Sequence, residues 1–197
     1  MNLDKDYFLN KYNLMLPHSE IVKAMPDLPK GKALDLGCGG GRNSLYLAQQ
    51  GFTVDAWDHN ENSIKKLDTI CVNESIDSIM TRVVDLNDLE FSGQYDVIIS
   101  TVVFMFLNPK SIPNLIGNMQ KSTKKGGYNL IVSAMNTEDY PCNLDFFNFT
   151  FKPKELSSYY QSWTIKKYNE DTGLLHKTDE QGNRIELRFA TLLAQKN

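Results

Sequence analysis

The segment whose residue types and spacing point most directly to chemistry is a run of glycines that reads LDLGCGGGRN over residues 34–43. Glycine permits a tight turn and lets the backbone approach a ligand closely. The free N–H groups at the start of a following helix favour an anion, such as the carboxylate of S-adenosylmethionine. The run therefore predicts a cofactor loop, whose contacts we assign to Gly37, Cys38, Gly39, Arg42 and Asn43.

Polar residues at the ends of later strand-like segments extend this prediction. Asp58, followed by His59, closes the second segment and would accept hydrogen bonds from the ribose hydroxyls. Asp85 and Leu86 follow the third and would meet the adenine ring, while Thr101 ends the fourth, beneath the sulfonium. Ligands bind at the carboxyl edge of such sheets, which favours a site over the alternative of aspartates that merely cap turns.

The amino-terminal segment has two interpretations. Residues 6–24 predict one or two short helices, so residues 1–28 are expected to form a helical cap over the cofactor site. Tyr7 and Tyr12 would then cover the cofactor, or they would simply pack. Asp35 lies inside a buried strand, where an ionised carboxylate needs partners, and is expected to order the glycine loop.

The elements that must position these residues alternate along the chain. Strands are predicted at 33–37, 53–57, 80–84, 95–100 and 128–134, and helices at 41–50, 61–73, 109–121 and 152–161. Gly126 and Gly127 are expected to stop the third of these helices. Segments 163–169 and 184–194 read as two adjacent strands with turn residues between them, hence as an antiparallel hairpin at one edge. We predict an α/β fold in which a seven-stranded, mostly parallel sheet has helices on both faces, the Rossmann-like layout of class I methyltransferases.

Composition limits the classes of partner. The 197 residues suit one domain, and 24 acidic against 21 basic residues give a net charge of −3. Nucleic-acid binding normally needs a basic excess, so we predict no nucleic-acid partner. Three cysteines without a CxxC pair predict neither a zinc site nor disulfides. The longest apolar run is too short for a bilayer and no leader pattern is present, so we expect a cytoplasmic protein, monomeric or homodimeric, away from membranes.

Three basic residues near the carboxyl terminus are candidates for holding the substrate that accepts the methyl group, called the acceptor below. His176 and Lys177 precede the predicted hairpin turn and Arg184 follows it. Pairing of the two strands would bring Lys177 and Arg184 close together, and cations beside a methyl donor suit a small oxyanion. The alternative is a solvated, charged hairpin.

The sequence resembles the TehB tellurite-resistance methyltransferases, collinearly and over nearly the whole chain. The segments that carry this resemblance are LDLGCGGGRNSLYLA, VDAWD, RVVDLND, YDVIISTVVFMFL, KKGGYNLIVSAM, DYPC and GNRIELRFATLLA. The resemblance implies methyl transfer from S-adenosylmethionine to tellurite or selenite by a bacterial cytosolic enzyme. It also implies cofactor residues at Gly37, Asn43, Asp58, Asp85 and Thr101, and acceptor-side cations at His176, Lys177 and Arg184.

One departure from the family concerns Lys177, where relatives usually have arginine. Lysine keeps the charge but lacks the planar, bidentate fork of a guanidinium. We expect a chalcogen lone pair to attack the methyl carbon in line, with Arg184 and Lys177 holding the oxyanion and His176 positioning it or exchanging a proton. Replacing Asp58 should weaken cofactor binding, whereas replacing Arg184 should spare it and lower turnover.

Other functions remain compatible with the same residues. The first is a methyltransferase that acts on another small thiol or organic acid. The second is a nicotinamide oxidoreductase, which the carboxyl-terminal hairpin and the crowded glycine run disfavour. The third is a sensor that binds S-adenosylmethionine without catalysis.

Overall fold

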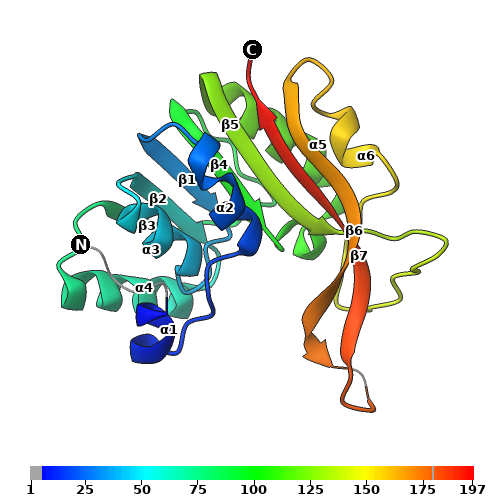
Figure 1. Ribbon diagram of the computed structural model, residues 1–197, viewed down its shortest axis with the longest axis horizontal. Coiled ribbons are helices and arrows are strands. Elements are labelled where there is room, and N and C mark those ends of the chain that lie inside the picture. The colour runs from blue at the N-terminus through cyan, green and yellow to red at the C-terminus, as the bar shows by residue number, and fades with distance from the viewer. Residues whose placement is uncertain (1–5, 179) are drawn as a thin grey trace.

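The chain forms a seven-stranded sheet in the order β3-β2-β1-β4-β5-β7-β6 (Figure 1). The computed structural model describes residues 6–178 and 180–197, except for the side chain of residue 176. Strands β1 to β5 pair in parallel, and β7 pairs antiparallel with both β5 and β6. The strands are β1 Lys32–Leu36, β2 Thr53–Asp58, β3 Ile79–Val83, β4 Tyr95–Thr101, β5 Thr123–Ala134, β6 Thr164–Thr178 and β7 Arg184–Gln195.

Helices cover both faces of the sheet because its central strands are apolar on both sides. In β1, Ala33 packs into one core, whereas Leu34 and Leu36 pack into the other, as the two-residue period of a strand requires. The first core takes apolar residues of α1 Tyr7–Tyr12, α2 Ser19–Ala24, α3 Arg42–Gln49 and α4 Glu61–Glu74. The second takes those of α5 Ile112–Ser122 and α6 Glu155–Ser158. The three-layer class I methyltransferase fold predicted from the sequence is therefore confirmed.

Three short 3₁₀ turns complete the helical elements, at η1 Met25–Asp27, η2 Phe104–Phe106 and η3 Pro109–Ser111. The predicted helix 109–121 thus begins as η3 and becomes regular only in α5. Within the described residues, no helix is both long and apolar enough to cross a membrane.

Several predicted boundaries differ from the structure. The glycines at 126 and 127 lie inside β5, which begins at Thr123, and they do not stop a helix. The N–H of Gly126 donates to the carbonyl of Lys196, so pairing with the chain end extends β5. The predicted helix 152–161 shrinks to α6, because Lys154 takes a left-handed conformation (φ 62°) at its amino-terminal cap.

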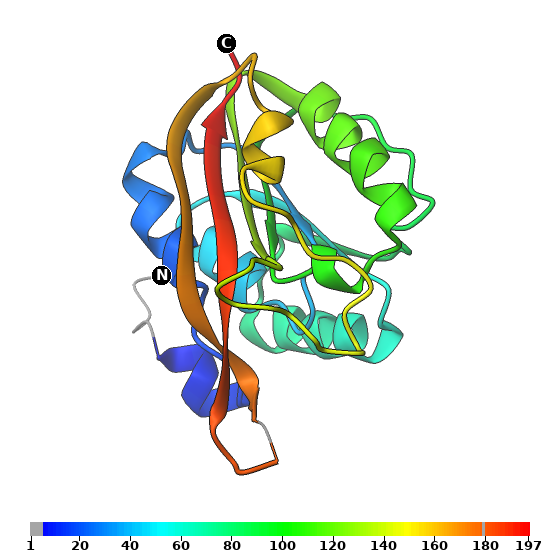
Figure 2. The same ribbon diagram turned by 90° about the vertical axis from the view of Figure 1, so that its right-hand side faces the viewer.

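Strand β6 is much longer than predicted and forms an arm with β7. Pairing between β5 and β7 ends at Ala134↔Phe189, whereas β6 and β7 remain paired as far as Thr178↔Arg184. The part past β5, residues 171–178 and 184–188, is called the hairpin arm below. Figure 2 shows the arm reaching well past the end of the other strands. The arm projects from the carboxyl edge of the parallel strands, where the predicted site residues end.

Candidate active site

The glycine loop joins β1 to α3 in a conformation that depends on its glycines. Gly37, Gly39 and Gly41 have φ of 75°, 53° and 89°. A Cβ added to Gly37 would lie 2.4 Å from Val103 Cγ2, and one added to Gly41 would lie 2.3 Å from Leu67 Cδ1. At Gly39 the same atom would meet nothing within 4 Å. The outer glycines therefore pack against the core, and the middle one faces open space.

Asp58, at the carboxyl end of β2, is bonded to this loop. Its Oδ2 accepts the Gly39 N–H at 2.8 Å, and its Oδ1 accepts the Asn60 N–H at 2.8 Å. His59 Nδ1 lies 3.4 Å from the same Oδ1, although the His59 side chain is exposed. The carboxylate is almost buried, and an oxygen that accepts one hydrogen bond, as Oδ2 does from Gly39, retains a lone pair for a further donor. Such an acceptor beside a glycine turn suits the hydroxyl pair of a ribose.

Asn43, in the first turn of α3, connects three segments. Its Nδ2 donates to Thr101 Oγ1 at 3.0 Å, and its Oδ1 accepts the backbone N–H of His18 at 2.9 Å. Asn43 and Thr101 are both buried. Arg42 adds a weaker contact from Nη1 to the carbonyl of Leu16, at 3.4 Å. The residues after the glycine loop therefore fix the amino-terminal segment against the end of β4.

Two buried ionisable groups, Asp35 and Cys38, lie in or directly before the glycine loop. Asp35 accepts the Ser44 hydroxyl at 2.6 Å, which ties β1 to α3. Burial raises the pKa of the Asp35 carboxyl to about 6, although the Ser44 bond and Arg42 oppose the shift. Burial also raises the pKa of the Cys38 thiol well above its usual range, so this thiol stays protonated and is not a nucleophile at neutral pH.

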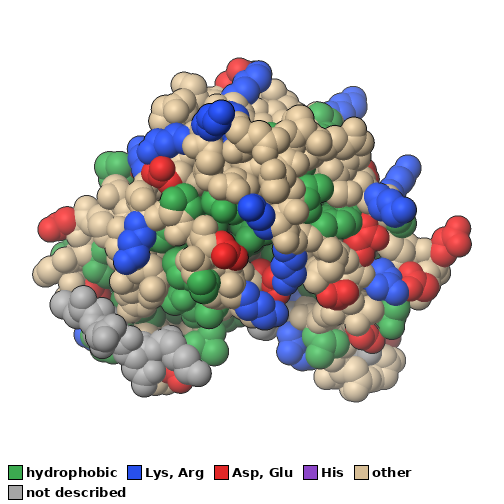
Figure 3. All heavy atoms as spheres, turned by 45° about the horizontal axis from the view of Figure 1, so that its top comes forward, with side chains coloured by type: hydrophobic (Ala, Val, Ile, Leu, Met, Phe, Trp, Pro, Cys, Tyr) green, Lys and Arg blue, Asp and Glu red, His purple; other side chains and the backbone are tan. Residues whose placement is uncertain are grey.

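A cavity of about 870 Å³ lies between this loop and the hairpin arm. The loop, Thr101 and the amino-terminal segment form one end, and residues of β6 and β7 form the other. Figure 3 shows a notch in the surface between the arm and the rest of the molecule, with hydrophobic, basic and acidic side chains around it. In the part of the chain that the structure describes, no group of three or more His, Cys, Asp or Glu side chains is placed to hold a metal ion.

The donor end of this cavity fits S-adenosylmethionine by its chemistry. Gly39 leaves space that a side chain would fill, and the start of α3 offers N–H groups to a carboxylate. Asp58, bonded to the loop from outside the cavity lining, offers acceptors to hydroxyls. The model for the family described as "Tellurite resistance protein TehB" matches residues 1–193. The chain belongs to the TehB family.

Individual relatives agree with this assignment. The chain is 52% identical over 98% of its length to "Probable S-adenosyl-L-methionine-dependent methyltransferase TehB" of Haemophilus influenzae strain 10810, and it covers 66% of that protein. A protein of Eikenella corrodens named "Hemagglutinin 1" is 44% identical over 97% of the chain, which covers 63% of it. The crystal structure of TehB from Haemophilus influenzae is 51% identical, with a TM-score of 0.94 over 98% of this chain and 67% of that one. The chain therefore spans about two thirds of the length of these relatives.

Not all of the predicted cofactor residues reach the cavity. Gly37, Cys38, Gly39, Arg42, Asn43 and Thr101 line it, whereas Asp58 and His59 lie outside the lining. Tyr7 and Tyr12 instead place their hydroxyls on the carboxylate of Glu74 in α4, where Lys11 also pairs. These tyrosines thus join α1 to α4 by hydrogen bonds, so they pack against the protein and do not cover the cavity.

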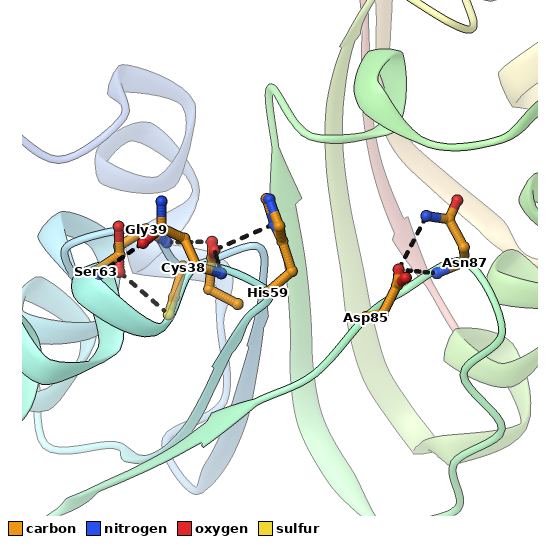
Figure 4. Close-up of polar contacts among 8 residues, drawn as sticks. Cys38, Gly39, His59, Ser63, Asp85 and Asn87 are labelled. Atoms are coloured by element: carbon orange, nitrogen blue, oxygen red, sulfur yellow. Dashed lines mark hydrogen bonds and ion pairs between the residues drawn. The ribbon is translucent and has the colours of Figure 1, made fainter.

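The predicted adenine contacts, like Asp58, lie outside the cavity lining. Asp85 Oδ1 accepts both the N–H and the side-chain amide of Asn87 at 2.9 Å, and the Asp85 side chain is exposed (Figure 4). Leu86 is buried in the second core. Asp85 has the turn-capping bond of the alternative interpretation, and its exposed carboxylate keeps a second oxygen for a ligand.

The three acceptor-side cations have different environments. Lys177 lines the cavity, with Nζ 3.8 Å from the centre of the Phe146 ring. Arg184 does not line it, because its Nε and Nη2 donate to the carbonyls of Leu175 and Leu174 at 2.7 and 2.9 Å. The side chain of His176 lies outside the described residues. Arg184 therefore braces the arm, and Lys177 faces the cavity.

Sequence reasoning missed four aromatic side chains that line the cavity. Phe146 and Phe147 lie in the loop between β5 and α6, Phe106 in η2 and Phe189 in β7. The sequence signal is confined to Phe146 and Phe147, which belong to the aromatic run DFFNF over 145–149, in a segment without the pattern of a helix or strand. The ion pair between Glu20 and Lys167, 147 residues apart, gave no signal at all.

Proposed function

We propose that the protein is a methyltransferase that transfers the methyl group of S-adenosylmethionine to a chalcogen nucleophile, with the oxyanions tellurite and selenite as its acceptors. The observation that carries the proposal is the glycine loop bonded to Asp58 at one end of a large cavity. Membership of the TehB family supports it, as do the names of the Haemophilus influenzae relatives.

At the donor end, this chain's residues would bind and orient the cofactor. The amino terminus of α3 and the open face of Gly39 would receive its carboxylate, and Asp58 its ribose hydroxyls. Thr101, held by Asn43, would form the floor beneath its sulfur. When bound, S-adenosylmethionine supplies an electrophilic methyl group on a sulfonium leaving group.

At the acceptor end, the protein needs to attract an anion and align it. A chalcogen lone pair is itself the nucleophile, so no strong general base is required. Lys177 faces the cavity and would draw the anion by charge, while Arg184 would act by holding the arm. Most of the rate enhancement would then come from proximity and orientation.

Two measurements test this proposal in sequence. Calorimetry should detect S-adenosylmethionine binding, and S-adenosylhomocysteine should then form only when selenite or tellurite is added. The variant Asp58→Asn should weaken cofactor affinity by about 10- to 100-fold, because it loses charged acceptors for the loop and the ribose. Asp77→Asn, an exposed aspartate on the loop after α4, is the matched control and should bind normally.

The outcomes separate the alternatives. Binding with acceptor-dependent product supports methyl transfer to the chalcogen. Binding without product from selenite, tellurite or any thiol would identify a protein that only senses the cofactor. Absence of binding would reject the proposal.

A further inference from the structure

The acceptor end of the cavity is walled by aromatic rings. Phe106 and Phe147 pack edge to face with ring centres 5.4 Å apart, and Phe146 packs on Phe147 at 4.8 Å. Phe189 of β7 lines the same space. Edge-to-face contacts fix the orientation of the rings, so they form a preformed surface against which another apolar group can pack.

Two of these rings and two further apolar side chains around them remain in contact with solvent. The exposed fractions of four lining side chains are 50% for Met15, 49% for Phe106, 37% for Phe146 and 52% for Leu174. These four come from the α1–α2 connection, η2, the β5–α6 loop and the hairpin arm. Apolar side chains from four separate segments that stay exposed around one cavity mark a binding surface, because folding alone would bury them.

Charged side chains of both signs line the cavity beside the wall, among them Glu20, Asp171 and Lys177. Within the described part of the chain, Lys177 has no ion pair, and its ammonium rests on the face of Phe146. The carboxylate of Glu20 is already paired with Lys23 and Lys167. Asp171 accepts a hydrogen bond from the side-chain amide of Asn169. Lys177 is thus the cation on the aromatic side that is open to a ligand.

Resting on the methyl transfer proposed above, we propose that the preferred acceptor is a small organic anion: a thiolate or selenolate attached to an aromatic or branched apolar body. The body would pack on the wall of Phe106, Phe146, Phe147 and Leu174, and the anionic chalcogen would lie beside Lys177. A bare inorganic oxyanion would lose its hydration here and gain one cation in return. An organic anion keeps that cation and also buries the exposed rings.

The chemical step balances without an added oxidant or reductant. The chalcogen lone pair forms the bond to the methyl carbon, while the bond from that carbon to the sulfonium breaks. Its electron pair stays on the departing thioether sulfur. The acceptor loses its negative charge, the donor loses its positive charge, and no proton moves. The neutral thioether product no longer interacts with Lys177, which favours its release.

Binding of two matched probes tests the recognition independently of turnover. Methanesulfinate and benzenesulfinate share the same singly charged sulfinate head, and only the second carries an aromatic body. In calorimetry with protein saturated with S-adenosylhomocysteine, benzenesulfinate should bind at least about tenfold more tightly than methanesulfinate. Phe146→Ala and Leu174→Ala should remove most of that difference. Ile165→Ala is the control, because Ile165 is an exposed apolar residue of the same strand β6 that does not line the cavity.

Turnover separates failure of this inference from failure of the proposed function. Benzenethiol, whose thiolate is populated near neutral pH, should give a kcat/KM at least about tenfold above that of selenite, and Phe146→Ala should lower the first more than the second. Equal affinity for the two probes, or turnover of selenite without benzenethiol, would overturn the organic acceptor and leave methyl transfer standing. No binding of S-adenosylmethionine would reject methyl transfer itself.

Discussion

The two ends of the cavity are built in different ways. At the donor end, short hydrogen bonds join groups close to one another around β1, β2 and α3, such as Asp35 with Ser44 and Asp58 with Gly39. At the acceptor end, the contacts join segments far apart in the chain, such as Glu20 with Lys167 and Arg188 with Asp139. The donor end is buried and polar, whereas the acceptor end is exposed and aromatic.

This difference indicates how the site is specialised. Buried polar groups are costly unless each has a partner, so the donor end tolerates little change and suits a cofactor that never varies. The acceptor end consists of a loop and an arm past the sheet edge, which packing constrains less. Changes at the donor end should therefore affect stability and cofactor binding, and changes at the acceptor end should affect turnover.

The largest effect should come from adding a methyl group to the glycine loop. Gly41→Ala would put Cβ 2.3 Å from Leu67 Cδ1 at a φ of 89°, so we expect a loss of about 4 kcal/mol in the free energy of unfolding. Gly39→Ala shares the positive φ but has open space, and should cost about 1 kcal/mol. Urea denaturation measures both. Equal losses in the two variants would show that the cost of the substitutions comes from backbone conformation and not from packing against Leu67.

A second prediction concerns the pH dependence of stability. Burial raises the pKa of Asp35 from 3.8 to about 6, so the folded protein binds this proton more tightly than the unfolded chain does. Asp35 therefore lowers stability as the pH rises from about 4 to 6, by up to about 3 kcal/mol, and the loss persists above that range. Asp35→Asn should remove this slope in denaturation series at several pH values. An unchanged slope would mean that Asp35 is not its source.

At the acceptor end, replacement of Lys177 and replacement of Arg184 should have different kinetic effects. Lys177→Ala should lower oxyanion turnover about tenfold, mainly through KM, because it removes the charge that faces the cavity. Arg184→Ala should lower kcat, since it frees the carbonyls of Leu174 and Leu175 and loosens the arm. Steady-state kinetics and calorimetry check both, with cofactor affinity changed less than about twofold. Turnover that survives Arg184→Ala would contradict the role of the arm.

The smallest effect should be the coupling between Glu20 of α2 and Lys167 of β6, which form a direct ion pair. The side chain of Glu20 is 13% exposed and that of Lys167 is 37% exposed, so solvent screens the pair. A double-mutant cycle with Glu20→Gln and Lys167→Met should give a coupling of about 0.5 kcal/mol in unfolding. A coupling above about 2 kcal/mol would mean that the acceptor end is as tightly constrained as the donor end.

Much of the fold could be predicted because it follows from local patterns. Each parallel strand was a short apolar run bounded by turn residues, and the glycine loop lay between a strand and a helix. Boundaries failed where tertiary pairing overrode the local signal. Gly126 and Gly127 were expected to stop a helix, but the carbonyl of Lys196, from the far end of the chain, incorporates them into β5.

The sequence by itself determined the layout of the sheet and the donor end of the site, since residues that follow consecutive parallel strands necessarily meet at one edge. Only the tertiary structure decided which of those residues face the cavity. In the folded chain, Tyr7 and Tyr12 bond to Glu74, and the guanidinium of Arg184 donates to backbone carbonyls. The tertiary structure also brought Phe106, Phe146 and Phe189 to one wall. The physical reason is that side-chain contacts between distant segments depend on packing and loop paths, and no local period encodes either.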